Sequence, residues 1–344
     1  MNTIATWCER NDEGKRVTDG KLDDVLLDVH INFWKLLNRA VKRNEYLLDM
    51  GFKINDISKL SKFNVHFPFK IDRCNLQDLG KVLIDNKQIV NSIFNEHYQI
   101  HDGKVSKQLS IQDSEGLTLF NIYAIDFSQD VNDCIICDKW GGSLLTLDLS
   151  RIQHQCDCSK YYFRFRLKGD VAKKFRREHK PEARYFQSAF TATETIDFRL
   201  NEKRNYQASL SETIKSENEF KIKNIHFLLL RKSNDDFESK HINASCRELE
   251  PELWGKYVGD QYDLDNILAY HWSDKRPDGD KCIDSFNTLV KMKYNKSSVL
   301  TVMIYLLVLW SFSIIFNVSS GYIKDKIDSK ISKHEKISSN VKSL

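Results

Sequence analysis

The sequence predicts an α+β protein in which N-terminal helices pack on an antiparallel, β-rich sandwich or open barrel, followed by one C-terminal transmembrane helix. Three observations favour this class: apolar residues recur every three or four positions before residue 100, they alternate with polar residues after it, and an uncharged apolar stretch lies near the C-terminus. Of the 344 residues 41% are hydrophobic, which is sufficient for a packed core and excludes a disordered chain. The formal net charge of +4 excludes binding of polyanions through bulk charge.

The N-terminal part, residues 21–100, is expected to be mainly helical after a polar leader at 1–20. Apolar residues at helical spacing predict a helix over 22–48, although 25–33 also alternates as a strand would. A second helix is expected over 76–97. These helices would cover one face of the sheet that follows.

Residues 101–250 are expected to form a β-rich domain, which a mixed juxtamembrane segment follows at 251–297. Alternating apolar residues predict strands at 63–71, 118–127, 143–152, 161–168, 195–200 and 224–232. Because no regular helices separate the later strands, we expect them to pair antiparallel.

Residues 298–318 are predicted to form a transmembrane helix. The stretch 299–318 contains no charged side chain, and 20 residues of helix rise about 30 Å, which matches the hydrocarbon thickness of a bilayer. The Lys-rich tail at 319–344 is expected to continue as a weakly amphipathic helix, because Ile323, Ile327 and Ile331 repeat every four residues. A lipid bilayer is therefore the first predicted partner.

The N-terminal residues contain no apolar stretch of the length that a secretory signal needs, which predicts that the bulk of the chain is cytoplasmic. The lysine count favours the opposite orientation, with four lysines in 279–298 and six in 319–344. We place more weight on the absent signal, since the two counts differ by only two charges.

Four of the eight cysteines cluster as Cys134-Ile-Ile-Cys137 and Cys156-Asp-Cys158. A CxxC turn supplies two thiolates from one knuckle, and a second pair about 18 residues later would complete a structural zinc site. The second pair is CxC, which points both side chains to one face of an extended strand. The alternatives are small buried hydrophobic cysteines in strands, or a redox pair.

Positive charge is concentrated between residues 160 and 184, where ten Lys/Arg oppose three acidic residues. If 161–168 is a strand, its even positions form one face, and that face is predicted to be the solvent side. The predicted anion-binding residues are Tyr162, Arg164, Arg166, Lys168, Arg176 and Arg177. Their guanidinium groups suit a nucleic acid, a nucleotide or a lipid headgroup. A solvated, salt-bridged strand face is the alternative.

Enzymatic motifs are few, and the sequence has no phosphate-binding Gly-rich loop, no Gly-x-Ser-x-Gly elbow and no kinase set. One arrangement suggests chemistry: Asp197 in a strand, followed by Glu219 and Lys221 before the strand at 224–232. Two acids and a lysine of this kind can hold Mg²⁺ and orient a water molecule on a phosphodiester. The alternative function is therefore a membrane-tethered, metal-dependent nuclease.

The favoured function is a membrane-tethered, cytosolic, non-enzymatic binding or sensing module for an anionic ligand, with a protein partner or a second copy as further candidates. Only 13 Gly and 4 Pro are present, a composition that suggests an AT-rich gene. Such genes are often accessory microbial genes, which extends this hypothesis to a role in host–virus conflict.

Overall fold

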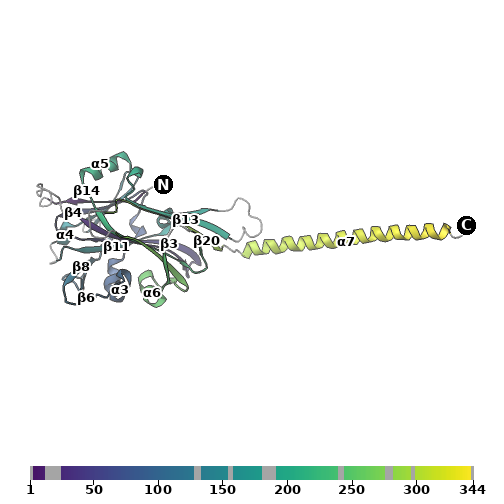
Figure 1. Ribbon diagram of the computed structural model, residues 1–344, viewed down its shortest axis with the longest axis horizontal. Helices are drawn as coiled ribbons and strands as arrows, with labels where there is room; N and C mark the ends of the chain where they lie inside the picture. The colour runs from purple at the N-terminus through teal and green to yellow at the C-terminus, as the bar shows by residue number, and fades with distance from the viewer. Residues whose placement is uncertain are drawn as a thin grey trace. The chain divides into compact units, whose positions relative to one another are not determined.

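The computed structural model describes residues 3–11, 25–127, 133–153, 158–179, 191–238, 244–275, 282–295 and 299–341. The chain divides into two compact units. The first, formed by 1–179 and 193–293, carries the sheets and the candidate site, and the second, formed by 180–192 and 294–344, carries the C-terminal helix. Figure 1 shows the elements of each unit in the colours of their position along the chain.

Strands make up most of the first unit. They are β1 Ala5–Arg10, β2 Leu26–Asn38, β3 Arg43–Ile54, β4 Leu60–Phe67, β5 Leu76–Asp78, β6 Gln99–Asp102, β7 Gln108–Gln112, β8 Thr118–Tyr123, β9 Cys134–Lys139, β10 Gly142–Asp148, β11 Tyr161–Lys168, β12 Arg176–His179, β13 Thr191–Leu200, β14 Asn218–Glu219, β15 Lys221–Lys232, β16 Asp236–Phe237, β17 Ser245–Glu248, β18 Tyr262–Asp263, β19 Ile267–Lys275 and β20 Phe286–Asn295. The helices are η1 Arg73–Asn75, α2 Gly80–Asp85, α3 Lys87–Phe94, α4 Ser150–Gln153, η2 Gly169–Phe175, η4 Lys203–Asn205, α5 Ala208–Ser216, α6 Pro251–Val258 and α7 Val299–Val341.

The described strands form three sheets. Two have the orders β14-β1-β4-β10-β9 and β12-β13-β20-β16. The third has eleven strands: nine follow the order β17-β19-β15-β2-β3-β11-β8-β7-β6, and in addition β18 pairs with β2 and β5 with β11. Most neighbours are antiparallel, as predicted, but β15 pairs parallel with β2 and β11 pairs parallel with β8. The largest sheet is therefore mixed, and the strands that the structure describes close no barrel.

The predicted helix over 22–48 is wrong, because the described residues of this segment, from 25 onwards, form β2 and the first part of β3, which pair antiparallel. β2 lies in the middle of the largest sheet and is covered on both faces. Ile31 on one face joins the main core, whereas Trp34 and Leu36 on the other face join a second core. A strand buried on both faces has apolar residues at odd and even positions, and their spacing resembles that of an amphipathic helix.

The predicted helix over 76–97 is replaced by three short elements, β5, α2 and α3. α2 ends at Asp85, and Asn86 separates it from α3. α3 ends before Asn95, which has a φ of 54° in the left-handed region. An asparagine adopts this conformation more readily than most residues, and it commonly ends a helix. The N-terminal helices are thus shorter than the sequence pattern indicated.

The strand predictions were more accurate than the helix predictions where the run of alternating residues was long. β11 has the predicted bounds of 161–168, and β4, β8, β10, β13 and β15 overlap the other predicted strands. Of these strands, β8, β11 and β15 share the largest sheet with β2 and β3: β11 pairs with β3, and β15 pairs with β2.

The two largest of the three apolar clusters among the described residues fill most of the interior of the first unit. The larger cluster lies between sheets and includes Ile31 of β2 and Phe63 of β4. The smaller one contains Trp34 of β2, Val90 of α3 and Trp254 of α6. In Figure 1, α3 and α6 lie side by side next to the largest sheet. The helices therefore cover the second face of the sheet, and this is the face on which the candidate site lies.

One helix in the described part of the chain is long and apolar enough to cross a membrane, and it is α7. The candidate span covers 302–332, and its apolar side chains, such as Trp310 and Phe316, are exposed. α7 continues without interruption past residue 318, so the tail that was predicted to be helical is part of the same helix. Ile323, Ile327 and Ile331 are exposed along it.

Candidate functional site

The strand predicted to present a basic solvent face is buried on that face. Tyr162 and Arg164 have no exposed surface, Arg166 is 1% exposed, and only Lys168 lies in solvent. The alternation correctly predicted which residues share a face of β11. It did not predict that α6 covers this face. The expectation of a solvent face made of these residues is therefore wrong.

A buried carboxylate, Asp49 of β3, organises the interior of this face. Arg166 donates to Asp49 twice, from Nε to Oδ1 at 2.6 Å and from Nη2 to Oδ2 at 3.0 Å. Trp34 Nε1 and the Tyr257 hydroxyl also donate to Oδ2, at 2.8 and 2.9 Å. A bidentate arginine pair with further donors is the arrangement that a buried carboxylate requires. The Asp49–Arg166 pair is thus fully satisfied.

Arg164 is held by neutral oxygens. Its Nε donates to the Tyr257 hydroxyl and its Nη1 to the Tyr162 hydroxyl, both at 2.6 Å. With the Asn32 amide oriented so that its oxygen faces the guanidinium, Nη2 donates to it at 2.9 Å. Among the described residues, no carboxylate pairs directly with Arg164, so two buried guanidinium groups share the single charge of Asp49. Burial opposes the charged form, but the nearby phenol oxygens and Asp49 raise the pKa of Arg164 above its ordinary value.

Gly51 makes room for this arrangement. It lies between His30 of β2 and Arg164 of β11 in the register of the sheet. A Cβ atom at Gly51 would lie 2.1 Å from the Tyr162 hydroxyl oxygen and 2.9 Å from Arg164 Nη1. No real Cβ tolerates such contacts, so only glycine allows the two side chains to reach across β3 towards β2.

Three histidines continue the network across the sheet. His30 and His226 are direct partners in the parallel pairing of β2 with β15, and their rings are 5.2 Å apart. His226 Nδ1 lies 3.1 Å from Nε2 of His271 on β19, and their rings are stacked. His30 Nδ1 in turn lies 3.2 Å from the Tyr162 hydroxyl. Polar contacts therefore lead from Arg164 through Tyr162 to His30, and an edge-to-face ring contact links His30 to the His226–His271 pair.

The histidines line a cavity of about 560 Å³, which we call the histidine pocket. Its other lining residues are Asp28, Asn32, Lys53, Ser92, Ile93, Phe94, Asn95, Glu96, Tyr98, Arg164, Asn224, Leu228, Ser245, Cys246, Arg247, Trp254 and Ala269. They come from β2, β3, β11, β15, β17 and β19 of the sheet, from α3 and the residues that follow it, and from α6. The volume falls within the range of about 300–1,000 Å³ typical of sites for organic ligands.

The electrostatics of the histidine pocket favour a negative ligand. Three cationic side chains line it against two carboxylates. Lys53 is paired with Asp28 at 3.3 Å and Arg247 with Glu250 at 3.5 Å, so Arg164 is the lining cation that has no carboxylate in direct contact among the described residues. Burial lowers the pKa of His30 well below its ordinary value, and His226, Arg164 and Lys53 act in the same direction. A neutral His30 donates or accepts one hydrogen bond at each ring nitrogen.

Sequence reasoning did not find this pocket. His30 and His226 each lie in a segment that alternates, but nothing local indicates that the two segments pair in parallel. Their neighbours Asp28 and Asn224 are 196 residues apart in the chain. Of the residues predicted to bind an anion, only Arg164 lines the pocket, and Tyr162 contacts His30 from beside it.

The remaining predicted anion-binding residues lie elsewhere. Arg176 is largely buried, 3.5 Å from both Glu178 and Glu194, and its guanidinium lies 4.5 Å from the centre of the Tyr46 ring. Arg177 is exposed on β12. The structure therefore does not gather the six predicted residues on one surface.

The cysteines do not form the expected knuckle. Cys134 and Cys137 lie in the strand β9, where they oppose Leu147 and Leu144 of β10. Residues three apart in a strand point to opposite faces, and accordingly Cys134 is buried whereas Cys137 is exposed. Cys158 is partly buried beside the Leu119 carbonyl, and Cys156 lies outside the described residues. In the described ranges, no group of three or more His, Cys, Asp or Glu side chains is placed to hold a metal ion.

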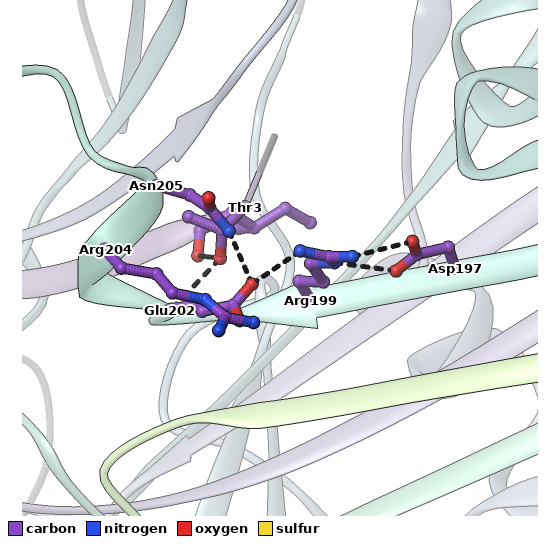
Figure 2. A network of polar contacts seen from close by, with 7 residues as sticks. Thr3, Asp197, Arg199, Glu202, Arg204 and Asn205 are labelled. Carbon is purple, nitrogen blue, oxygen red and sulfur yellow. Dashed lines mark hydrogen bonds and ion pairs between the residues drawn. The ribbon is translucent and has the colours of Figure 1, made fainter. Parts of the chain in front are cut away.

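The predicted nuclease residues each have a different environment. Asp197 of β13 accepts two hydrogen bonds from Arg199, at 2.8 and 3.0 Å, and Arg199 also contacts Glu202 at 2.9 Å (Figure 2). Glu219 is paired with Lys203 at 2.6 Å, and Lys221 is exposed at the start of β15. Figure 2 shows Arg199 between Asp197 and Glu202, with Asn205 also donating to Glu202, so Asp197 is already engaged by an arginine.

Comparison with known proteins adds no family to this description: no protein-family model matches the chain, and no curated protein sequence matches it.

Proposed function

We propose that this protein is a membrane-tethered binding module that takes a small anionic ligand in the histidine pocket, with the bulk of the chain on the cytoplasmic side. The observation that carries the proposal is the excess of buried positive charge beside the cavity. Arg164 and Arg166 share one carboxylate, and Arg164 lines the pocket. The apolar helix α7 supports the membrane attachment.

The chemistry of the pocket suits binding better than reaction. Arg164 donates to the hydroxyls of Tyr162 and Tyr257, and Tyr257 in turn donates to Asp49, which fixes the floor of the pocket in one arrangement. A fixed set of donors with an unbalanced positive charge recognises an anion without having to rearrange. The network therefore prepares the site before a ligand arrives.

The experiment uses full-length protein in detergent micelles and measures its thermal unfolding with sulfate, phosphate and citrate at constant ionic strength. We expect saturable stabilisation by at least one anion, because a ligand that binds only the folded state raises the midpoint. Lys53→Met should abolish the effect, since Lys53 lines the pocket. Lys168→Met is the matched control, because Lys168 belongs to the same sheet but lies in solvent.

Two results would contradict the proposal. One is the absence of saturable stabilisation by any of the three anions. The other is stabilisation that survives Lys53→Met but is lost in Lys168→Met, which would return the anion site to the exposed end of β11.

A further inference from the structure

The histidine pocket offers more hydrogen-bond donors than its own acceptors use. Trp254 is 1% exposed and lines the pocket, and within the described residues its indole Nε1 has no hydrogen-bond partner. A buried N–H group without an acceptor is unfavourable, and a ligand oxygen that reached the indole would satisfy it. Lys53 and Arg247 also line the cavity, paired with Asp28 at 3.3 Å and with Glu250 at 3.5 Å, and their remaining N–H groups add charged donors. A ligand that meets several donors from different directions carries several acceptor oxygens, as a phosphate group does.

The same pocket is much larger than a phosphate group and has an aromatic wall. Phe94, at the end of α3, and Tyr98 both line the cavity and are partly exposed. Their rings are 6.0 Å apart in an edge-to-face arrangement, and Phe94 lies 5.3 Å from the His30 ring. Aromatic side chains that remain partly exposed beside cationic donors are typical of surfaces on which nucleobases stack.

We propose that the histidine pocket binds a nucleotide, with the phosphate towards Lys53, Arg164 and Trp254 and the base against Phe94 and Tyr98. This inference rests on the proposed function and adds the ligand class to it. Phosphate alone would leave the aromatic wall unused, and a nucleoside alone would leave the excess positive charge unbalanced. A nucleotide satisfies both parts of the cavity.

Isothermal titration of the full-length protein in detergent micelles tests the inference with AMP, GMP, CMP, UMP, ribose 5-phosphate and adenosine as probes. We expect at least one nucleotide to bind about tenfold more tightly than ribose 5-phosphate, an effect of the size that one base–aromatic stack provides. Adenosine should bind at least tenfold more weakly than AMP, because it lacks the phosphate that the cations attract.

Variants separate the two halves of the pocket. Tyr98→Leu should weaken nucleotide binding about tenfold through loss of a stacking surface, while the affinity for ribose 5-phosphate stays unchanged. Lys53→Met should weaken both ligands. Phe94→Leu provides a second test of the aromatic wall, and the thermal midpoint of each variant without ligand shows whether it folds as the native chain does.

The outcomes distinguish this inference from the proposed function. If ribose 5-phosphate binds as tightly as every nucleotide, or if only sulfate or citrate binds, the nucleotide assignment is overturned and anion binding stands. If no anionic probe binds at all, both are overturned. Nucleotide binding that Tyr98→Leu and Phe94→Leu leave unchanged places the base elsewhere and also overturns the assignment.

Discussion

Arg164 and Asp49 lie in the same buried network without contacting each other, because the Tyr257 hydroxyl stands between them. It accepts a hydrogen bond from Arg164 Nε at 2.6 Å and donates one to Asp49 Oδ2 at 2.9 Å. The phenol thus connects Arg164 to the carboxylate, and Arg164 itself contacts only neutral oxygens among the described residues. This relay distinguishes Arg164 from Arg166, which Asp49 neutralises directly.

The relay predicts the effect of Tyr257→Phe. The substitution leaves Arg164 Nε buried without its acceptor, so we expect the free energy of unfolding to fall by about 1–3 kcal/mol. Tyr262→Phe is the matched control, since Tyr262 also donates to a carboxylate, Glu45, at 2.9 Å, but that carboxylate is partly exposed. Its loss should be about 1 kcal/mol or less. Equal losses in urea unfolding would show that the buried relay has no special role.

Gly51→Ala should disrupt the floor of the pocket. Its Cβ would lie 2.1 Å from the Tyr162 hydroxyl oxygen, so Tyr162 or β3 must move, and we expect a loss of stability of about 1–3 kcal/mol together with loss of anion binding. Gly255→Ala in α6 is the control, because a Cβ there meets no atom within 4 Å. It should be neutral or stabilise the protein by up to about 1 kcal/mol. Thermal unfolding with and without ligand measures both effects.

Stability should fall in mild acid because of His30. In the unfolded chain a histidine binds a proton as the pH drops below about 6.5, whereas the pKa of folded His30 is well below that value, chiefly through burial. The unfolded state then binds more protons, so the free energy of unfolding decreases as the pH falls from about 6.5 towards the folded pKa.

His30→Gln should flatten this decrease, and the exposed His97→Gln should not. Unfolding curves at a series of pH values between about 7 and 5 provide the comparison. The same slope in His30→Gln and the native protein would mean that His30 is not the group responsible.

The two cysteines of β9 should differ in reactivity. Burial raises the pKa of Cys134 to about 12, whereas Cys137 is exposed. Because the thiolate is the reactive form, iodoacetamide at neutral pH should modify Cys137 within minutes and Cys134 only after unfolding, as peptide mass spectrometry would show. Protection of Cys137 that a chelator removes would instead support the predicted zinc.

Local sequence patterns predicted which residues form strands better than they predicted which faces of those strands are buried. The alternation at 161–168 gave β11 correctly, but alternation alone cannot tell which face a neighbouring helix covers, and α6 belongs to a segment about 90 residues later. In β2, apolar residues on both faces produced a helical spacing, which only the pairing with β3 and β15 resolves.

The sequence did not predict the histidine pocket, for a related reason. Each histidine of the pocket lies in a different strand, and the strands meet through long-range pairing that no local signal encodes. The CxxC motif, which is typical of a turn, lies here in a regular strand, so its local geometry was not predicted, and zinc binding by these cysteines stays a prediction.

The parallel pairing of β2 with β15 also determines how long β2 waits for its partner while the chain is being synthesised. A ribosome that adds about 5–20 residues each second needs roughly 10–40 s to go from Asp28 to Asn224, which lie 196 residues apart. During that interval the nascent hairpin of β2 and β3 has no partner on its open edge, and its apolar residues attract other chains. Production of this protein should therefore depend on chaperones that shield early strands, and slower translation should lower the yield of native protein.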